Sequence, residues 1–402
     1  PWSFRGIPAS VPYFNMMLLN LAQAIIAIFL ASDFIKRDRK SNTTEVIYMR
    51  SMSNADYILG KSLGLFSVFL GLNIVLLIIA AVINIVFADT PFQFLPYLYY
   101  LSLISIPTLI FIFGLSFFVM SIIGNQAITF LLLLGYFAIS LVALNFKFQS
   151  AFDGVGFFMP LAYSDFVGFS DLPALLMQRL SYLSTGIGLI FVSVLLFKRL
   201  PQSKAMQGIS RVFAVGFIGI GAVLFTTYLL DARSGTSLRT EMKELNDSFA
   251  AKSVGMVLDY DITLNHNGDR ITAEALINIA NDGNADLSEF IFTLNPGLDI
   301  TSTTINDAPV QFERNVHLLI VKPGKALAPG QSAELKIQYK GAINEDACYI
   351  AATDEERSSI NQVMMYKVGK KSAFLSSRYL MLTPEAGWYP IPGVGQGTGL
   401  IN

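Results

Sequence analysis

The chain has 402 residues, a mean hydropathy of +0.53 and only 14% charged residues, far below the share of about 25% in soluble domains. This composition excludes an ordinary soluble enzyme and is typical of an integral membrane protein. The net charge of −1 argues against a nucleic-acid partner. Charges are sparse before Leu230 and frequent after it, so we expect a membrane domain followed by a water-soluble one.

Six stretches are apolar and long enough to cross a bilayer, because about 20 helical residues span the ~30 Å hydrocarbon core. The expected helices cover residues 13–31, 62–87, 96–123, 127–145, 180–197 and 212–230. Residues 90–146 carry no charge, and this region is more than twice as long as one membrane crossing requires. We therefore expect a turn at Gly124 and Asn125 that divides it into two helices. Pro107 should kink the helix before that turn. The aromatic residues 146–179 predict an interfacial loop, with or without a short re-entrant helix.

The orientation follows from the Lys and Arg residues of the short loops, which stay on the cytoplasmic side. With residues 33–61 in the cytoplasm, the inside segments hold ten basic residues and the outside segments hold three, among them Arg179. The soluble half then lies outside the cytoplasm. This alternation also puts Pro1 outside, so we expect an additional helix upstream of it.

After the last apolar stretch, the hydrophobic period changes from that of a helix to that of a strand. Residues 231–253 are polar and predict a linker or a short amphipathic helix. From residue 254 the alternation has a period of two, which indicates strands separated by tight turns. Residues that share one face on either side of a turn at 265–269 are Tyr260, Ile262, Leu264, Ile271, Ala273, Ala275, Ile277 and Ile279. The expected fold is a six-helix membrane bundle followed, over residues 254–402, by an all-β antiparallel sandwich or saddle.

Four segments of the soluble half carry a family resemblance: DYDITLNHNGDRITAEALINIAN, LSEFIFTLNPGLDITSTTINDAPVQF, LAPGQSAELKIQYKG and TPEAGWYP. Their series resembles the N-terminal β-domain of gluzincin zinc aminopeptidases of the membrane-alanyl-aminopeptidase kind. In that family the β-domain lends a side chain to the free amine of the substrate, a role that suits a fixed carboxylate. The resemblance implies Glu385, in TPEAGWYP, for this role. The alternative is a surface carboxylate near a sheet edge.

The zinc chemistry of that family requires H-E-x-x-H on a helix, with a further carboxylate downstream. This chain has two histidines, His266 in a predicted turn and His317 in a predicted strand, and neither precedes a Glu. We therefore expect His266 to be solvated and His317 to be structural, and we expect no catalytic residue or metal site in this chain. The chain begins at Pro1 and ends after the connector-like GVGQGTG, so we interpret it as a fragment. Zinc is expected only in a missing C-terminal catalytic domain, and the single cysteine, Cys348, is expected to be a buried thiol.

The segment TTEVIYMRSMSNADYILGKSLG lies in the basic loop between the first two expected helices. It resembles the corresponding loop in permease subunits of type 2 ABC exporters, which occur in bacteria fused to aminopeptidase-like modules. The resemblance implies docking of a separate ATPase subunit. The implied coupling residues are Thr43, Thr44, Glu45, Arg50 and Lys61. The other interpretation of these charges is a basic anchor that is drawn to anionic lipid.

Three functions remain open from the sequence. The first is a permease subunit of an ABC-type exporter with an extracytoplasmic aminopeptidase-like module. The second is a membrane-anchored zinc aminopeptidase whose permease-like half is mainly an anchor, and the third is a non-catalytic envelope scaffold. We expect a multi-pass protein of the bacterial inner membrane. Its expected partners are an ABC ATPase, the lipid bilayer and a peptide substrate, with a homodimer allowed for and no nucleic acid.

Overall fold

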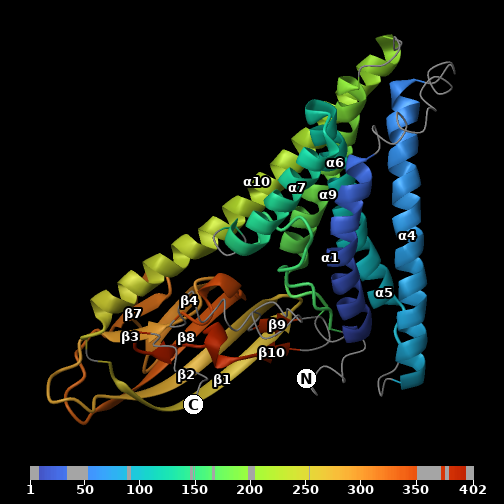
Figure 1. Cartoon of the computed structure of the whole chain (residues 1–402). Coiled ribbons are helices and arrows are strands. Elements are labelled where there is room, and N and C mark those ends of the chain that lie inside the picture. The colour runs from blue at the N-terminus through green and yellow to red at the C-terminus, as the bar shows by residue number, and fades with distance from the viewer. Residues whose placement is uncertain are drawn as a thin grey trace. The chain divides into compact units, whose positions relative to one another are not determined.

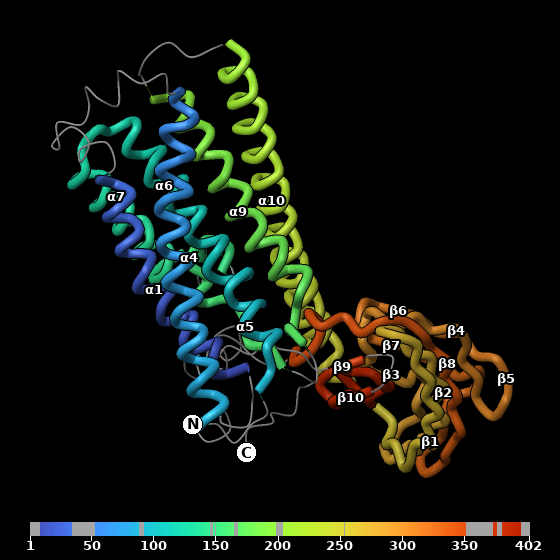
Figure 2. Tube along the Cα trace, turned by 90° about the vertical axis from the view of Figure 1, so that its right-hand side faces the viewer, coloured from blue at the N-terminus to red at the C-terminus, as the bar shows by residue number. Residues whose placement is uncertain are grey.

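The structure is a computed structural model, and it describes residues 9–33, 53–87, 92–144, 148, 150–164, 168–197, 204–252, 254–350, 373–375 and 380–394. The chain forms two compact units, which divide between Ala232 and Arg233. The first unit is helical, and the second carries all the named strands (Figures 1 and 2). One helix continues through the division.

The helical unit is built from long apolar helices that lie side by side (Figure 2). Its elements are α1 (Ser10–Ser32), α4 (Asn54–Phe87), α5 (Leu95–Tyr100), the π-helical η2 (Leu101–Ser105), α6 (Ile106–Ile123), α7 (Gln126–Ile139), the π-helical η3 (Ser140–Leu144), α9 (Leu172–Leu196) and α10 (Lys204–Phe249). Counted over the described residues, six helical stretches have the length and hydropathy of a membrane crossing. These stretches overlap the six expected spans.

The turn between α6 and α7 confirms the predicted division of the uncharged region. Gly124 has a φ of +68°, and its N–H donates to the carbonyl of Met120 at 2.9 Å. This is the left-handed C-cap for which glycine is preferred. The Asn125 side chain then accepts from the N–H groups of Ala127 and Ile128, which caps the next helix.

Helices α4, α9 and α10 each begin eight residues earlier than predicted, and for α9 the capping signal lies outside the apolar stretch. The Asp171 side chain accepts from the N–H of Ala174 at 3.0 Å, so α9 starts at Leu172 rather than at residue 180. Pro173 does not break this helix, because a proline in the first turn needs no donor. Helix α4 starts at Asn54 rather than at residue 62. Among the described residues of 146–171, no re-entrant helix is present.

Helices α6 and α9 cross with their backbones in direct contact. The crossing lies at Gly114 and Gly186, where a Cβ added to Gly186 would lie 2.6 Å from the Cα of Phe111. Small residues at a crossing allow membrane helices to gain packing energy that larger side chains would prevent. Phe111 and Tyr182 meet edge to face beside this contact, with ring centroids 4.7 Å apart.

The second unit contains two antiparallel sheets of five and four strands and a short pair. The strands are β1 (Met256–Asn267), β2 (Arg270–Ala280), β3 (Phe290–Thr293), β4 (Leu298–Ile305), β5 (Ala308–Pro309), β6 (Gln311–Asn315), β7 (Leu318–Lys322), β8 (Ser332–Ala342), β9 (Ala373–Leu375), β10 (Leu380–Leu382) and β11 (Ile391–Pro392). The sheet orders are β1-β2-β8-β4-β5, β11-β3-β7-β6 and β10-β9. Alternate residues of β2 and β8 form a core with β3 and β7, as in a sandwich.

The first hairpin confirms the predicted faces but has a shorter turn. The five alternate residues of β2 from Ile271 to Ile279 are all buried. Asn267 pairs with Arg270, so the turn is only Gly268 and Asp269 rather than residues 265–269. Only Gly268 has a positive φ, of +63°, which is the requirement of a type II′ turn.

Residues 231–253 are not an irregular linker, because α10 continues as one helix to Phe249. Its polar part buries a stripe at helical spacing, made of Gly235, Arg239 and Met242. Met242 packs with Ala347 and Ile350 of the second unit. Of the two predictions for residues 231–253, the amphipathic helix is therefore the one that the structure contains, and this helical part belongs to the folded β-domain.

We predict that Gly186→Ala destabilises the bundle by about 1–3 kcal/mol, because the added methyl group forces two packed backbones apart. The matched control is Gly135→Ala in α7, where a Cβ meets nothing within 4 Å. That control should be neutral or stabilising by up to about 1 kcal/mol, the helix-propensity gain. Thermal unfolding of the full chain in detergent measures both. Equal melting temperatures for the two variants would contradict the backbone contact.

Candidate functional site

The predicted amine-binding residue, Glu385, lies in a single turn of 3-10 helix, Pro384–Ala386. The N–H of Ala386 donates to the carbonyl of Thr383, and that of Gly387 donates to the carbonyl of Pro384. Gly387 has a φ of +59°, which ends the turn and reverses the chain before Trp388. The position of Glu385 is therefore defined by a tight, hydrogen-bonded loop.

Asn295 joins this loop to the LNPGL turn between β3 and β4. Its buried side-chain amide donates to the carbonyls of Ala386 at 2.9 Å and Asn344 at 3.0 Å. Its side-chain oxygen accepts from the N–H groups of Gly297 and Asn344, and its own N–H donates to the carbonyl of Gly387. Two of the segments that carry the aminopeptidase resemblance are thus held together by one side chain.

The Glu385 carboxylate has one buried oxygen, Oε2, without a hydrogen-bond donor among the described residues. The side chain is half-buried, so part of it still reaches solvent. A buried acceptor that lacks a donor is unfavourable, and an ammonium group is the strongest partner for it. The loop can therefore offer a carboxylate to a primary amine.

The residues of this chain do not fit a gluzincin zinc site. Within the described residues, no three His, Cys, Asp or Glu side chains come together in a way that could hold a metal ion. His266 lies in β1 beside the first hairpin turn. His317 lies in the turn between β6 and β7 rather than in a strand, where Val316 has a φ of +52° and reverses the chain.

His317 is fully buried against the polar part of α10. Its Nε2 lies 2.7 Å from the side-chain oxygen of Asn246, and Nδ1 has no partner among the described residues. Burial, with the nearby Arg314 guanidinium acting in the same direction, lowers the pKa of His317 to about 4. This histidine is therefore neutral near pH 7 and has a structural role.

Arg239 provides the second polar contact between α10 and the β-domain. One guanidinium nitrogen donates to the carbonyls of Asp346 at 3.2 Å and Cys348 at 2.7 Å, and another donates to that of Tyr349 at 2.9 Å. Cys348 is buried, as predicted. A guanidinium suits this position because it presents several donors in one plane.

The helical unit contains a buried basic side chain that the sequence analysis assigned to an outside loop. Arg179 lies in α9 and is 1% exposed. Its Nε donates to the carbonyl of Leu103 at 2.7 Å, and one Nη donates to the carbonyl of Ile104 at 3.1 Å and the Thr108 hydroxyl at 2.7 Å. Pro107 has no N–H, so the carbonyl four residues earlier, that of Leu103, lacks its helical donor. Arg179 replaces that donor.

Asp153 lies in the connection before α9 and is also fully buried. Its two carboxylate oxygens accept from the N–H groups of Gly156 at 2.8 Å and Phe158 at 2.5 Å. Its carbonyl accepts from the side chain of Gln178 at 2.9 Å and from Arg179 at 3.5 Å. The connection is thereby fixed to the first two turns of α9, which the sequence analysis treated as loop.

A chain of amides extends this polar cluster across the bundle. The Gln23 side chain donates to the Asn20 oxygen at 2.9 Å and accepts from Asn73 at 2.7 Å, while Ser105 donates to Asn73 at 2.7 Å. Asn20 in turn donates to Thr108 at 3.1 Å. Helices α1, α4, α6 and α9 are therefore connected by buried hydrogen bonds.

Sequence reasoning missed the role of Arg179. The missed signal was the pattern of Asp171 followed by Pro173, which marks a helix start and places Arg179 inside α9.

Of the predicted ATPase-coupling residues, Thr43, Thr44, Glu45 and Arg50 lie outside the described residues. Lys61 is not in a loop, because it lies within α4, with its Nζ 5.7 Å from the Tyr57 ring centre.

The start of α4 is strongly fixed. Ser53 and Asp56 form a reciprocal capping box, with bonds of 2.9 and 3.1 Å between each backbone N–H and the other side chain. The Asn54 side chain donates to the carbonyl of Phe197 at 2.6 Å, beyond the end of α9. The start of α4 is therefore tied to the end of α9 within the bundle.

Comparisons with known proteins gave a limited similarity. No family model matches the chain, and no curated protein matches it. Among solved structures, the M1 zinc metallopeptidase from Deinococcus radiodurans is 18% identical over 23% of this chain and 21% of its own, with a TM-score of 0.21. A two-domain M1 zinc metallopeptidase variant bound to L-arginine is 18% identical over 35% of this chain and 31% of its own, with a TM-score of 0.25. The chain thus spans less than a third of those two metallopeptidases.

We predict that His317 makes the β-domain lose stability as the pH falls from about 6.5 to 4. The unfolded chain binds a proton in this window, with a histidine pKa of about 6.5, while the folded chain does not until about pH 4. The unfolded state holds more protons there, so stability rises with pH, by about 3 kcal/mol over the window. The measurement is the unfolding of the full chain carrying Trp2→Phe at several pH values, monitored by the fluorescence of Trp388.

His317→Gln should remove that part of the pH slope. The control is His266→Gln in the first hairpin, which should keep the slope of the parent chain. An unchanged slope in His317→Gln would contradict the assignment of a buried neutral histidine.

Proposed function

We propose that the chain is the membrane subunit of an ABC-type exporter that carries an aminopeptidase-like β-module outside the cytoplasm. The observation that carries this proposal is the buried polar cluster around Arg179 and Asp153. Buried charges within membrane spans are expensive and mark functional positions by default. An anchor needs only one apolar helix, without a charge inside it.

The broken helix at this cluster supports the same function. Helices α5 and α6 are joined through the π-helical η2, directly before Pro107. Transport proteins use discontinuous helices of this kind near the middle of the bilayer, where freed backbone groups and side chains form substrate paths. In this chain Arg179 binds the carbonyl of Leu103 that Pro107 frees. A change in the Arg179 contacts would make this carbonyl available to a substrate path.

The geometry of α4 supports coupling to a cytoplasmic ATPase. With 34 residues, the helix is about 51 Å long, while a bilayer core needs about 30 Å. Its capped start at Ser53 therefore extends beyond the hydrocarbon region. A force on residues 34–52 would act directly on α4, and through Asn54 on the end of α9. This arrangement agrees with the resemblance of the loop to exporter permeases.

The second function, a membrane-anchored zinc aminopeptidase, is favoured by one observation. Glu385 presents a buried carboxylate oxygen without a donor, as a binding site for a substrate amine requires. The zinc ligands would have to come from residues outside this sequence. A non-catalytic scaffold is the third function, and no contact in the structure specifically favours it.

We predict that Arg50→Glu uncouples the bundle from its ATPase, because the reversed charge repels the surface that the basic loop binds. The measurement is the ATP hydrolysis rate of the ATPase that co-purifies with the full-length protein in lipid nanodiscs. The rate should lose its stimulation by the membrane subunit, while the melting temperature of the subunit stays the same.

The matched control is Lys340→Glu, which reverses one exposed charge on β8 of the other unit and should retain the stimulation. If no ATPase co-purifies, or if Arg50→Glu retains full stimulation, the exporter proposal fails. Hydrolysis of aminoacyl reporter substrates by the full-length protein, with a higher KM in Glu385→Gln, would instead support the second function.

A further inference from the structure

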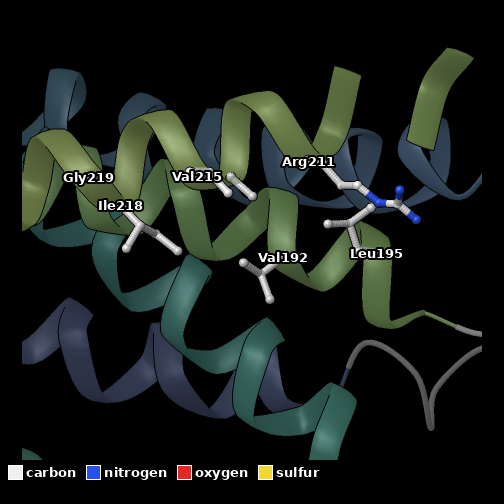
Figure 3. Close-up of a pocket in the computed structure, with 7 residues that line it drawn as sticks. Val192, Leu195, Arg211, Val215, Ile218 and Gly219 are labelled. Atoms are coloured by element: carbon white, nitrogen blue, oxygen red, sulfur yellow. The ribbon is translucent and has the colours of Figure 1, made fainter. Parts of the chain in front are cut away.

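An apolar groove lies between α9 and α10 in the helical unit (Figure 3). Its volume is about 420 Å³. The lining residues are Val192 and Leu195 of α9 with Arg211, Ala214, Val215, Ile218 and Gly219 of α10. All lining side chains except that of Arg211 are apolar.

The groove exists because glycines hold the two helices together on one side of it only. A Cβ at Gly188 would lie 2.6 Å from the Ile218 side chain, and one at Gly221 would lie 3.0 Å from the carbonyl of Ser181. A Cβ at Gly219 would meet nothing within 4 Å. The helices are therefore in close contact near Gly188 and Gly221, and the space beside Gly219 stays open.

Arg211 stands at the end of the apolar stretch of α10. It is followed by residues 212–230, which contain no charge, so its side chain lies at the edge of the hydrocarbon core. The side chain is exposed. In the described part of the chain, no hydrogen bond or ion pair engages it. An exposed guanidinium at this depth is suited to a phosphate, which it can bind through two parallel hydrogen bonds.

The surrounding sequence gives the site a strong charge preference. Between Asp171 and Asp231 there is no acidic residue, whereas the short stretch 198–211 contains four basic residues, Lys198, Arg199, Lys204 and Arg211. The local field is therefore positive, and it favours a ligand with a net negative head group. The groove provides the matching apolar surface for a hydrocarbon chain.

We propose that this groove binds one anionic phospholipid, with an acyl chain along Val192, Val215 and Gly219 and the phosphate on Arg211. The lipid would fill the space between α9 and α10 that protein side chains leave open. This site is independent of the exporter proposal, because it requires only that the helices span a bilayer.

The test uses the full chain in detergent, with phosphatidylglycerol and phosphatidylcholine as probes. Native mass spectrometry counts the lipids that the protein retains, and thermal unfolding measures the stabilisation by each lipid. Wild-type protein should retain one phosphatidylglycerol and be stabilised by it more than by phosphatidylcholine. Arg211→Gln should weaken phosphatidylglycerol binding by about tenfold or more, because it removes a charge-assisted contact. Arg233→Gln, an exposed position on the same helix but outside both the groove and the apolar stretch, should leave it within a factor of about two.

Gly219→Phe should abolish retention by filling the groove, and it should fold normally because a Cβ there meets no atom. The control is Gly216→Phe, where a Cβ also meets nothing within 4 Å and which does not line the groove. Equal binding of the two lipids, unchanged binding by Arg211→Gln, or equal effects of Gly219→Phe and Gly216→Phe would each overturn the proposal. So would a change from dimer to monomer in Gly219→Phe without a change in retained lipid, because the occupant would then be a second copy of the chain.

Discussion

The hydrogen bonds from Arg179 to the carbonyls of Leu103 and Ile104 are the interaction on which the helical unit depends. Hydrocarbon offers no donors, so every carbonyl that a proline frees must be bound by the protein itself. The guanidinium satisfies two carbonyls and one hydroxyl at once. Its own charge is in turn enclosed by the connection that Asp153 fixes. The broken helix, the connection before α9 and α9 itself therefore have to form together.

Helix α10 shows how a single element can serve two solvents. Its first part is uncharged over residues 212–230, and its packing against α9 depends on close contacts at glycines. Its second part is polar on the outside and buries a stripe at helical spacing, with Arg239 and Met242 at the centre. Because this stripe contacts the β-domain through polar bonds at Arg239 and Asn246, the β-domain includes the end of the last span.

Hydropathy located the six long helices because the membrane imposes a minimum apolar length, and period two located the first hairpin because one face of the sheet is buried. The turn at Gly124 and Asn125 was predictable because both residues act locally. By contrast, the pairing of β2 with β8 joins segments about 60 residues apart, and a single sequence carries no signal for that choice.

The site residues were less predictable, since their roles depend on distant contacts. Arg179 was counted as a loop charge because the aromatic residues 146–179 were interpreted as an interfacial loop, although Pro173 is favourable in the first turn of a helix. The family resemblance indicated Glu385, but the loop that carries it is held by Asn295, about 90 residues earlier. The burial of His317 depends on α10, whose polar part the sequence predicted only as a linker or a short amphipathic helix.

The central claim is that Arg179 completes the backbone that Pro107 breaks, and a double-mutant cycle tests it most directly. Pro107→Ala restores the N–H that can bind the carbonyl of Leu103, so Arg179→Gln should destabilise the wild-type bundle more than it destabilises the Pro107→Ala bundle. The free energies of unfolding, measured for all four proteins in the same detergent, should give a coupling energy of at least about 1 kcal/mol. Additive effects, within about 0.5 kcal/mol, would contradict the account.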